Sequence, residues 1–439
     1  MNFDIATWEE NKELVLDLIR SEFSESERGS DRRVSPPLYD SQQALQELLK
    51  SPISNLKTLL ETTLAQSIKL HRPEVMGHQV APPSAEAVAA QWFGDFMNYG
   101  MGVQEMGQFS AVLEEYVIQK MGRIFGFQNP VGGILTSGGS LGNLTALLVA
   151  RNVHPDATYV YKKNAHYSNS RALKIIGIPA EKRVAIESWS DLSTLVVSGP
   201  LVLIASACST ALGKFDPITE ICDFAEQRGN CFVHVDAAHG GGAIFSPSLK
   251  SKIEGIERVD SLVFDFHKMA LSPSLVTLVL YKKPEHRYAT FEEDASYLWD
   301  ENGTEDVFNK ANQTIECTKP PLGLRAYTCL EIIGTKKLGA FNEEVVDLTL
   351  KAAHLIDQHA TFQLYEKPEY NILVFECLET PNQIALRNAL LEQGKFYITA
   401  TQLGAKSYLR ICIMNSGTGL EHITALLDEL LGLAKALRA

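Results

Sequence analysis

Between residues 131 and 283 the chain alternates short, continuously apolar runs with amphipathic stretches. The stretches at 140–152 and 215–229 have the spacing of helices that bury one face. Continuous apolar runs of this length are typical of strands buried on both faces of a sheet. The runs are VGGILTS (131–137), LVLIASA (201–207), CFVHVD (231–236), SLVFDF (261–266) and LVTLVLYKK (275–283). The pattern predicts an α/β fold with a mainly parallel central sheet and helices on both faces.

The two ends of the chain follow different patterns. The N-terminal part predicts helices, and its segment TLLETTLAQSIKL (58–70) has an apolar face that needs a partner, either another subunit or the chain's own domain. Beyond about residue 340, two helices and two strands predict a small α+β unit; they are 338–359, 371–378, 408–415 and 419–437. We therefore expect a helical N-terminal arm (1–75), a large domain (76–340) and a small C-terminal α+β domain (341–439).

Composition and charge narrow the class of protein. The 439 residues carry a formal net charge of −13, and 45% are hydrophobic, which is enough for a large core. An acidic balance argues against nucleic acid or an anionic membrane as partner, because both attract surfaces rich in Lys and Arg. The N-terminus lacks the pattern of a signal peptide, and no apolar run reaches the roughly 18 residues of a membrane span. The seven cysteines are widely spaced without a CxxC pair, which disfavours disulfides or zinc and favours the cytoplasm.

The turn TSGGSLGN (136–143) stands between a predicted strand and a predicted helix. Backbone N–H groups at a helix N-terminus, together with a serine hydroxyl, form a site suited to phosphate. The turn matches neither GxGxxG nor the P-loop pattern, so those interpretations are disfavoured. A purely structural glycine turn is the competing interpretation.

Asp236 ends the strand CFVHVD and is followed by small residues. A carboxylate at a buried strand end needs a cation or hydrogen-bond donors. The protonated nitrogen of a pyridine ring would serve, and the carboxylate would keep that ring an electron acceptor. An Asp that caps a turn is the alternative.

Lys268 follows His267 after the strand SLVFDF. Open α/β sheets bind ligands in the crevice at the carboxyl ends of their strands. We expect a lysine in this crevice to lose its proton through burial and nearby positive charge, which would make it a Schiff-base nucleophile. A surface lysine at a strand end is the alternative.

His166 precedes a predicted helix, where it is either a cap or core residue, or an imidazole that stacks on a pyridine ring. Each of these signals is modest alone. A phosphate turn, a His, an Asp and a Lys 32 residues after that Asp together form the ordered set of a pyridoxal-phosphate (PLP) enzyme.

In these segments the chain resembles the group II PLP-dependent amino-acid decarboxylases, which include aromatic-amino-acid, glutamate, cysteine-sulfinate and 2,4-diaminobutyrate decarboxylases. The resemblance runs from about residue 70 to the C-terminus. HVDAAHGGG (234–242) and DFHKM (265–269) carry it most specifically, and TSGGSLGNLTALLVAR, AHYSNSRALKIIG and YLRICIMN support it in the expected order. It implies the aspartate-aminotransferase-like fold (fold type I), PLP as cofactor, decarboxylation of an L-amino acid to its amine and CO2, and a homodimer with active sites at the subunit interface.

The resemblance also implies a role for each motif residue. Lys268 holds PLP as an internal imine, Asp236 pairs with the pyridine nitrogen, and His166 stacks on the ring face opposite Ala238. The other cofactor-binding residues are Gly138, Gly139 and Ser140 at the phosphate, His267 nearby, and Thr210 at the cofactor or substrate. Arg410 in YLRICIMN corresponds to an arginine that meets a substrate carboxylate, with a solvated strand arginine as the alternative.

Tyr297 bears on the reaction type. It lies in EEDASYLWDEN, 29 residues after Lys268, and resembles the catalytic-loop tyrosine that protonates the substrate Cα after CO2 leaves. A phenol can donate this proton, whereas the phenylalanine of family members that form aldehydes cannot. A packed loop tyrosine is the alternative.

Two departures from the family pattern weaken the transfer of a substrate identity from the family to this chain. Asp265 and Phe266 stand where many members have Asn-Pro before His-Lys, and Pro320 takes the place of an arginine in TKPPLGLR (318–325). Acidic, diamino and aromatic amino acids all stay open as substrates, and no metal is expected. The alternative functions are a decarboxylating oxidase that forms an aldehyde, an aminotransferase or lyase of the same fold, and a non-catalytic homologue that acts as a binding partner.

Overall fold

The computed structural model describes residues 4–28, 33–36, 40–291 and 307–437. Contacts group the chain into two compact units, one of residues 1–78, 350–367 and 373–439, the other of residues 79–349 and 368–372. The division into three parts that we predict from the sequence stays a prediction. Among the described helices, none is long and apolar enough to cross a membrane.

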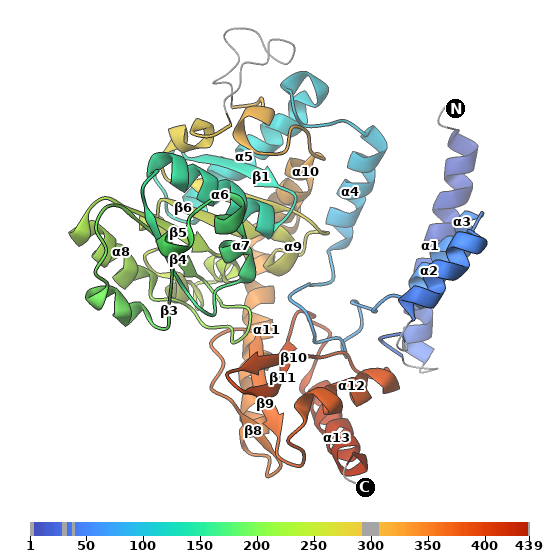
Figure 1. The fold of residues 1–439 in the computed structure, drawn as a ribbon. Coiled ribbons are helices and arrows are strands. Elements are labelled where there is room, and N and C mark those ends of the chain that lie inside the picture. Colours follow the sequence, from blue (N-terminus) through green and yellow to red (C-terminus); the bar gives the residue numbers. More distant parts are fainter. Residues whose placement is uncertain (1–3, 29–32, 37–39, 292–306, 438–439) are drawn as a thin grey trace. The chain divides into compact units, whose positions relative to one another are not determined.

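The unit of residues 79–349 and 368–372 contains a seven-stranded sheet (Figure 1). Its strands are β1 (Gly132–Thr136), β2 (Thr158–Lys162), β3 (Arg183–Ile186), β4 (Leu201–Ser206), β5 (Cys231–Asp236), β6 (Ser261–Asp265) and β7 (Thr277–Tyr281). The order across the sheet is β1-β7-β6-β5-β4-β2-β3. Neighbours from β6 to β3 pair in parallel, and only β7 runs antiparallel to both of its neighbours. The predicted mainly parallel sheet is confirmed.

Helices cover both faces of this sheet. Neighbouring residues of a strand point to opposite faces. A side chain at Gly133 of β1 would meet Ile118 of α5, whereas Ile134 packs with Ala146 and Val149 of α6. Helices α5 and α6 therefore lie on opposite faces, as the sequence pattern predicts. The helices of this unit are α4 (Ala85–Met97), α5 (Gln108–Ile124), α6 (Gly139–Val153), α7 (Tyr167–Ile175), α8 (Ile218–Arg228), α9 (Phe266–Met269), α10 (Leu322–Tyr327) and most of α11 (Thr335–Asp357).

The other unit combines N-terminal helices with an α+β segment from the C-terminal part of the chain. Its sheet has the order β10-β11-β9-β8, and β10 pairs with β11, as β8 does with β9, in antiparallel fashion. Val75 and Tyr397 form a parallel bridge between the two segments and pack with Val34. Its elements are α1 (Ile5–Arg28), α2 (Ser41–Lys50), α3 (Leu56–Ala65), β8 (Phe362–Leu364), β9 (Ile372–Cys377), α12 (Gln383–Gln393), β10 (Thr399–Leu403), β11 (Lys406–Cys412) and α13 (Leu420–Ala436).

Two details differ from the expectation from sequence. The helical pattern of 58–70 ends in the structure at Ala65, because residues 66–70 leave the helix and Ile68 and Leu70 pack beside Val34 and Val75. Strands β2 and β3 are absent from the predicted apolar runs. β2 ends on Lys162, β3 begins on Arg183, and both strands contain residues that are only half-buried, so neither shows a continuous apolar run.

Candidate active site

A cavity of about 350 Å³ opens at the carboxyl edge of the seven-stranded sheet. Residues at or just beyond the ends of β1, β4, β5 and β6 line it, namely Ser137, Ser206, Asp236 and Asp265. This edge is where α/β sheets of this kind bind ligands. Nine residues singled out from the sequence line the same cavity: Gly138, Gly139, Ser140, His166, Thr210, Asp236, Ala238, His267 and Lys268.

The glycine turn joins β1 to the N-terminus of α6. Gly138 has a φ of 124°, a backbone conformation that favours glycine. A Cβ atom at Gly139 would lie 2.9 Å from Oδ2 of Asp265, so the turn passes too close to that carboxylate for a side chain. The first N–H groups of α6 have no partner within the helix and are suited to an anion such as phosphate.

Asp236 is almost fully buried, with 7% of its surface exposed, at the end of β5. Its Oδ2 accepts hydrogen bonds from Nδ2 of Asn143 (2.9 Å) and Nδ2 of Asn169 (3.0 Å). Its Oδ1 accepts one from the backbone N–H of Ala238 (3.3 Å). Two helices, α6 and the one that follows His166, thus hold the carboxylate at the cavity, where it can pair with a cationic ring nitrogen.

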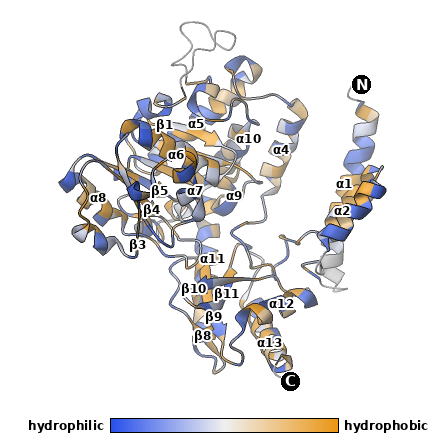
Figure 2. Ribbon diagram, in the orientation of Figure 1, coloured by the Kyte–Doolittle hydropathy of each residue, from blue (hydrophilic) through white to orange (hydrophobic). Residues whose placement is uncertain are grey.

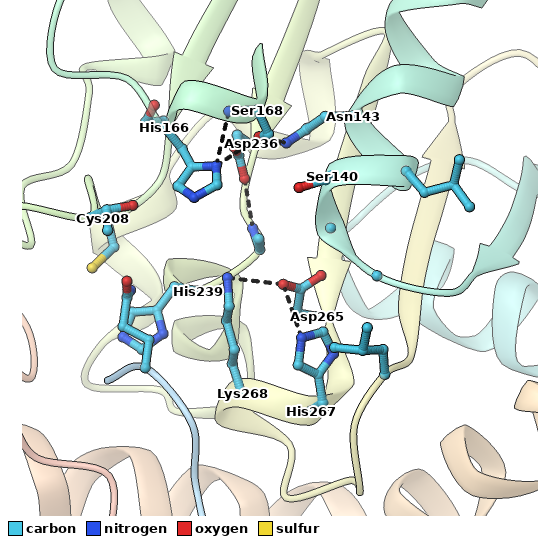
Figure 3. Close-up of a pocket in the computed structure, with 18 of the residues that line it drawn as sticks. Ser140, Asn143, His166, Ser168, Cys208, Asp236, His239, Asp265, His267 and Lys268 are labelled. Atoms are coloured by element: carbon cyan, nitrogen blue, oxygen red, sulfur yellow. Dashed lines mark hydrogen bonds and ion pairs between the residues drawn. The ribbon is translucent and has the colours of Figure 1, made fainter. Parts of the chain in front are cut away.

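Lys268 points its amine into the cavity from α9, toward Asp265 (Figure 3). The distance from Nζ to Oδ2 of Asp265 is 2.9 Å. Burial disfavours the ammonium, but Asp265 and Asp236 outweigh burial and raise the pKa of Lys268. The expectation that nearby positive charge helps this lysine lose its proton is wrong, because the charges that face it are carboxylates.

His166 caps helix α7. Its Nδ1 accepts a hydrogen bond from the backbone N–H of Ser168 (3.3 Å) and lies 2.7 Å from the Ser168 hydroxyl. Burial lowers the pKa of His166, and the nearby Asp236 opposes this effect. The ring is therefore a neutral imidazole at pH 7 that both caps the helix and lines the cavity (Figure 3).

Four polar residues of the site have no role in our sequence-based assignment. Asn143 and Asn169 hold Asp236, His234 contacts Asn143, and Asp265 pairs with Lys268. The signal that could have found Asn143 is its place on the apolar face of an amphipathic helix, because a buried amide needs partners. Nothing local in the sequence gives Asn169 or His234 a partner, since both contacts join distant segments.

Two of the predicted site residues lie elsewhere. Tyr297 is outside the described residues. Arg410 lies on β11 in the unit that contains residues 373–439, and its Nη1 donates to the carbonyl oxygen of Gly77 (3.0 Å) and to Oγ1 of Thr399 (3.3 Å). Contact between Arg410 and a substrate carboxylate stays a prediction. In the described part of the chain, no cluster of three His, Cys, Asp or Glu side chains could hold a metal ion.

Comparisons with known proteins agree with this pocket chemistry. The family model of the pyridoxal-dependent decarboxylase conserved domain matches residues 153–378. L-2,4-Diaminobutyrate decarboxylase of Rhizobium meliloti (strain 1021) is 26% identical over 419 residues, which cover 90% of this chain and 84% of that protein. Aromatic-L-amino-acid decarboxylase of Bacillus atrophaeus is 24% identical over 412 residues, with 88% and 86% covered.

A solved structure shares the fold across the full length. The Oryza sativa protein TDC, crystallised with PLP and tryptamine, matches 100% of this chain and 99% of its own with a TM-score of 0.87 at 17% identity. The predicted fold type I and the resemblance to group II decarboxylases are confirmed. The chain belongs to the pyridoxal-dependent decarboxylase family, and it is a PLP-dependent carboxy-lyase that acts on an amino acid.

Proposed function

We propose that this enzyme decarboxylates an L-amino acid to its amine with PLP attached to Nζ of Lys268. The observation that carries the proposal is the convergence of three anchors on one cavity: the amine of Lys268, the carboxylate of Asp236 and the glycine turn before α6. The three suit the aldehyde, the ring nitrogen and the phosphate of PLP, respectively. The chain therefore offers a matching group for each polar part of the cofactor.

PLP supplies an electron-accepting ring that stabilises the charge left on Cα when CO2 departs. Asp236 keeps the ring nitrogen protonated, and Asn143 and Asn169 keep Asp236 in place for this task. His166 and Ala238 would hold the ring between them. Gly138, Gly139 and Ser140 would bind the phosphate, and His267 and Thr210 line the same cavity.

Protonation at Cα decides between an amine and an aldehyde product. We assign this proton to the phenol of Tyr297, on the strength of its spacing from Lys268 and the loop that it resembles. Arg410 is our candidate for a substrate carboxylate, because its buried guanidinium carries a permanent positive charge. A Tyr297→Phe variant should consume O2 and release aldehyde in place of amine; unchanged amine yield would remove Tyr297 from this role.

The test of the main proposal compares two lysine variants. Lys268→Ala should lose both the visible absorbance of covalently held cofactor and CO2 release. Lys163→Ala is the control, because Lys163 is exposed and pairs with Glu187. Absorbance or CO2 release that survives in Lys268→Ala would overturn the assignment. The same assay with acidic, diamino and aromatic L-amino acids, scored for CO2 and amine, identifies the substrate.

We further infer a homodimer. Helices α4 and α5 expose large apolar side chains, among them Phe93 at 58% and Phe109 at 72%. The full set is Trp92, Phe93, Phe96, Met97, Phe109, Val112 and Tyr116. The ribbon of α4 carries hydrophobic stretches (Figure 2). Exposed apolar side chains concentrated in this way mark interaction surfaces. Phe93→Lys combined with Phe109→Lys should shift the molar mass in solution, measured by light scattering, from dimer to monomer. An unchanged mass would show that this surface makes no subunit contact.

A cytoplasmic location is our proposal for the enzyme. The seven cysteines, all within the described residues, form no disulfide, and reduced cysteines suit a reducing compartment. Fractionation of the source cells with an antibody to the chain tests this, and recovery with secreted proteins would contradict it.

A further inference from the structure

Asp265 is a buried carboxylate with partners on three sides. It ends β6 and has only 1% of its surface exposed. Its Oδ2 lies 2.9 Å from Nζ of Lys268 and 3.5 Å from Nε2 of His267. Its Oδ1 accepts a hydrogen bond from the hydroxyl of Thr277 over 2.5 Å. Both oxygens are thus engaged with groups that favour the ionised form.

The same carboxylate faces the glycine turn. The position of a Cβ atom at Gly139 is 2.9 Å from Oδ2 and 3.1 Å from Oδ1 of Asp265. Gly139 is the first residue of α6, a helix of 15 residues, so the negative charge of Asp265 lies beside the positive end of that helix. A phosphate bound at this turn would place a second anion within a few ångströms of the first.

We propose that Asp265 couples the binding of the PLP phosphate to the uptake of one proton. The phosphate therefore contributes less to cofactor affinity as the pH rises. The inference rests on the proposed function, because it takes Gly138–Ser140 as the phosphate site. Two anions in contact repel strongly at low effective dielectric constant, and a shared proton removes the repulsion.

The charges around Asp265 come from several elements. Lys268 and His267 on α9 are in direct reach, whereas Asp236 on β5, His166 before α7 and Cys208 after β4 are charge neighbours of Lys268 or Asp265. Burial alone would raise the pKa of Asp265, but Lys268, His267 and the Thr277 hydroxyl outweigh it and lower the pKa. The carboxyl group is therefore ionised at neutral pH.

The proton balance follows from the species at neutral pH. A phosphate monoester has its second pKa at about 6, so the cofactor arrives mostly as a dianion. One proton from solvent joins the phosphate–Asp265 pair, either on the phosphate or on the carboxylate. Covalent attachment at Lys268 has a separate proton balance. A C–N double bond forms between Nζ and the aldehyde carbon, and the aldehyde oxygen leaves as water with two hydrogens from Nζ.

Pyridoxal, which has the same aldehyde and no phosphate, separates the two balances. Attachment at Lys268 is common to PLP and pyridoxal, so the change with pH in the ratio of their dissociation constants reports the phosphate. We would strip the full-length protein of cofactor and measure both dissociation constants from visible absorbance at two pH values. These are about pH 6, the midpoint of the phosphate titration, and about pH 8, where nearly all of the phosphate is dianion. The proteins are the wild type and Asp265→Asn, which keeps the size of the side chain and removes its charge.

In the wild type, the preference for PLP over pyridoxal should fall by about tenfold or more from the lower to the higher pH. In Asp265→Asn it should not fall, and at the higher pH it should exceed the wild-type preference by about tenfold. Asp260→Asn is the control and should behave as the wild type does. It removes a carboxylate from the other end of β6, where Asp260 accepts from the backbone N–H of Val233.

If the wild type and Asp265→Asn show the same preference for PLP over pyridoxal at both pH values, the inference about Asp265 is wrong, whereas the proposed function is unaffected. If the wild type attaches neither aldehyde, the proposed function falls and the inference with it. Should Asp265→Asn fail to fold, Thr277→Val serves instead. Loss of the hydroxyl donor raises the pKa of Asp265, so the preference for PLP should persist to higher pH, and a wild-type profile would count against the inference.

Discussion

The side-chain amide of Asn143 donates a hydrogen bond over 2.9 Å to Oδ2 of Asp236. Its Oδ1, in turn, lies 3.0 Å from Nε2 of His234. Because an amide oxygen only accepts, Nε2 of His234 carries the proton, and Nδ1 accepts from the Ser261 hydroxyl at 2.8 Å. A chain of buried hydrogen bonds thus connects the sheet interior with the carboxylate that we assign to the cofactor ring.

Asn143→Ala should weaken this support. The change removes one of two amide donors to Asp236 and leaves Nε2–H of His234 without its acceptor, at a cost of about 1–3 kcal/mol. We expect PLP affinity, measured by absorbance titration, to fall by roughly tenfold together with a lower free energy of unfolding. Asn152→Ala is the control on the same helix, since Asn152 is exposed and bonds to Ala289. If Asn143→Ala and Asn152→Ala change PLP affinity and stability equally, the hydrogen bond from Asn143 to Asp236 does not support cofactor binding.

His234 should make the fold sensitive to acid. Burial lowers the pKa of His234 to about 4, whereas the same imidazole in an unfolded chain has its ordinary pKa of 6.5. Between about pH 4 and pH 6.5 the imidazole is protonated in the unfolded chain but not in the folded one. The free energy of unfolding therefore falls as the pH drops through this range. The full contribution is about 3 kcal/mol.

Denaturant titrations of the wild type and His234→Gln across that pH range measure this contribution. The difference in unfolding free energy between the two proteins should shrink as the pH falls. His154→Gln is the control. Burial also lowers the pKa of His154, but by less, so its pH dependence should be weaker. A constant difference for His234→Gln would rule out the buried imidazole as the cause.

The strands that the sequence predicts share one property. β1, β4, β5, β6 and β7 are mostly apolar, and almost all of their residues are buried. β2 and β3 belong to the same sheet and are its last two strands on one side. Some of their residues are half-buried or exposed, so their sequences are less apolar. A rule that looks for buried strands therefore finds the centre of the sheet and misses its margin.

The candidate site divides in the same way. Gly138, Asp236 and Lys268 follow strands at one edge of the sheet, so their convergence follows from topology and could be predicted. The hydrogen bond from Asn169 to Asp236 joins residues 67 positions apart and depends on how α7 packs. Likewise, the charge that Lys268 meets is set by Asp265, whose direction no local pattern reveals.

Asp236→Asn should separate cofactor binding from catalysis. The amide keeps the shape of the side chain but carries no negative charge to hold a ring nitrogen in its protonated form. We expect PLP to stay bound, visible by absorbance, while kcat falls by at least about 100-fold, the size of effect that loss of one electrostatic stabiliser has in other enzymes. A variant that binds PLP and keeps its kcat would remove Asp236 from the proposed role.

The buried ion pair of Glu114 and Lys319 should stabilise the strand that leads into the glycine turn. Nζ of Lys319 lies 2.6 Å from Oε1 of Glu114 and donates to the carbonyl oxygen of Leu135 over 2.5 Å, while Oε1 accepts from the Leu135 N–H over 3.1 Å. Both side chains are almost fully buried, so Lys319→Met leaves an uncompensated carboxylate and should lower the free energy of unfolding by about 3–5 kcal/mol.

Glu114→Leu combined with Lys319→Met completes the test of this pair. The double variant removes both charges of this pair, so it should lose less stability than Lys319→Met alone in denaturant titrations. The exposed pair of Lys163 and Glu187 is the control, and Lys163→Met should leave the stability nearly unchanged because water screens both charges. The stability of Glu114→Leu alone completes the comparison. If the loss in the double variant equals the sum of the losses in Glu114→Leu and Lys319→Met, each side chain acts through its own packing, and the ion pair does not stabilise β1.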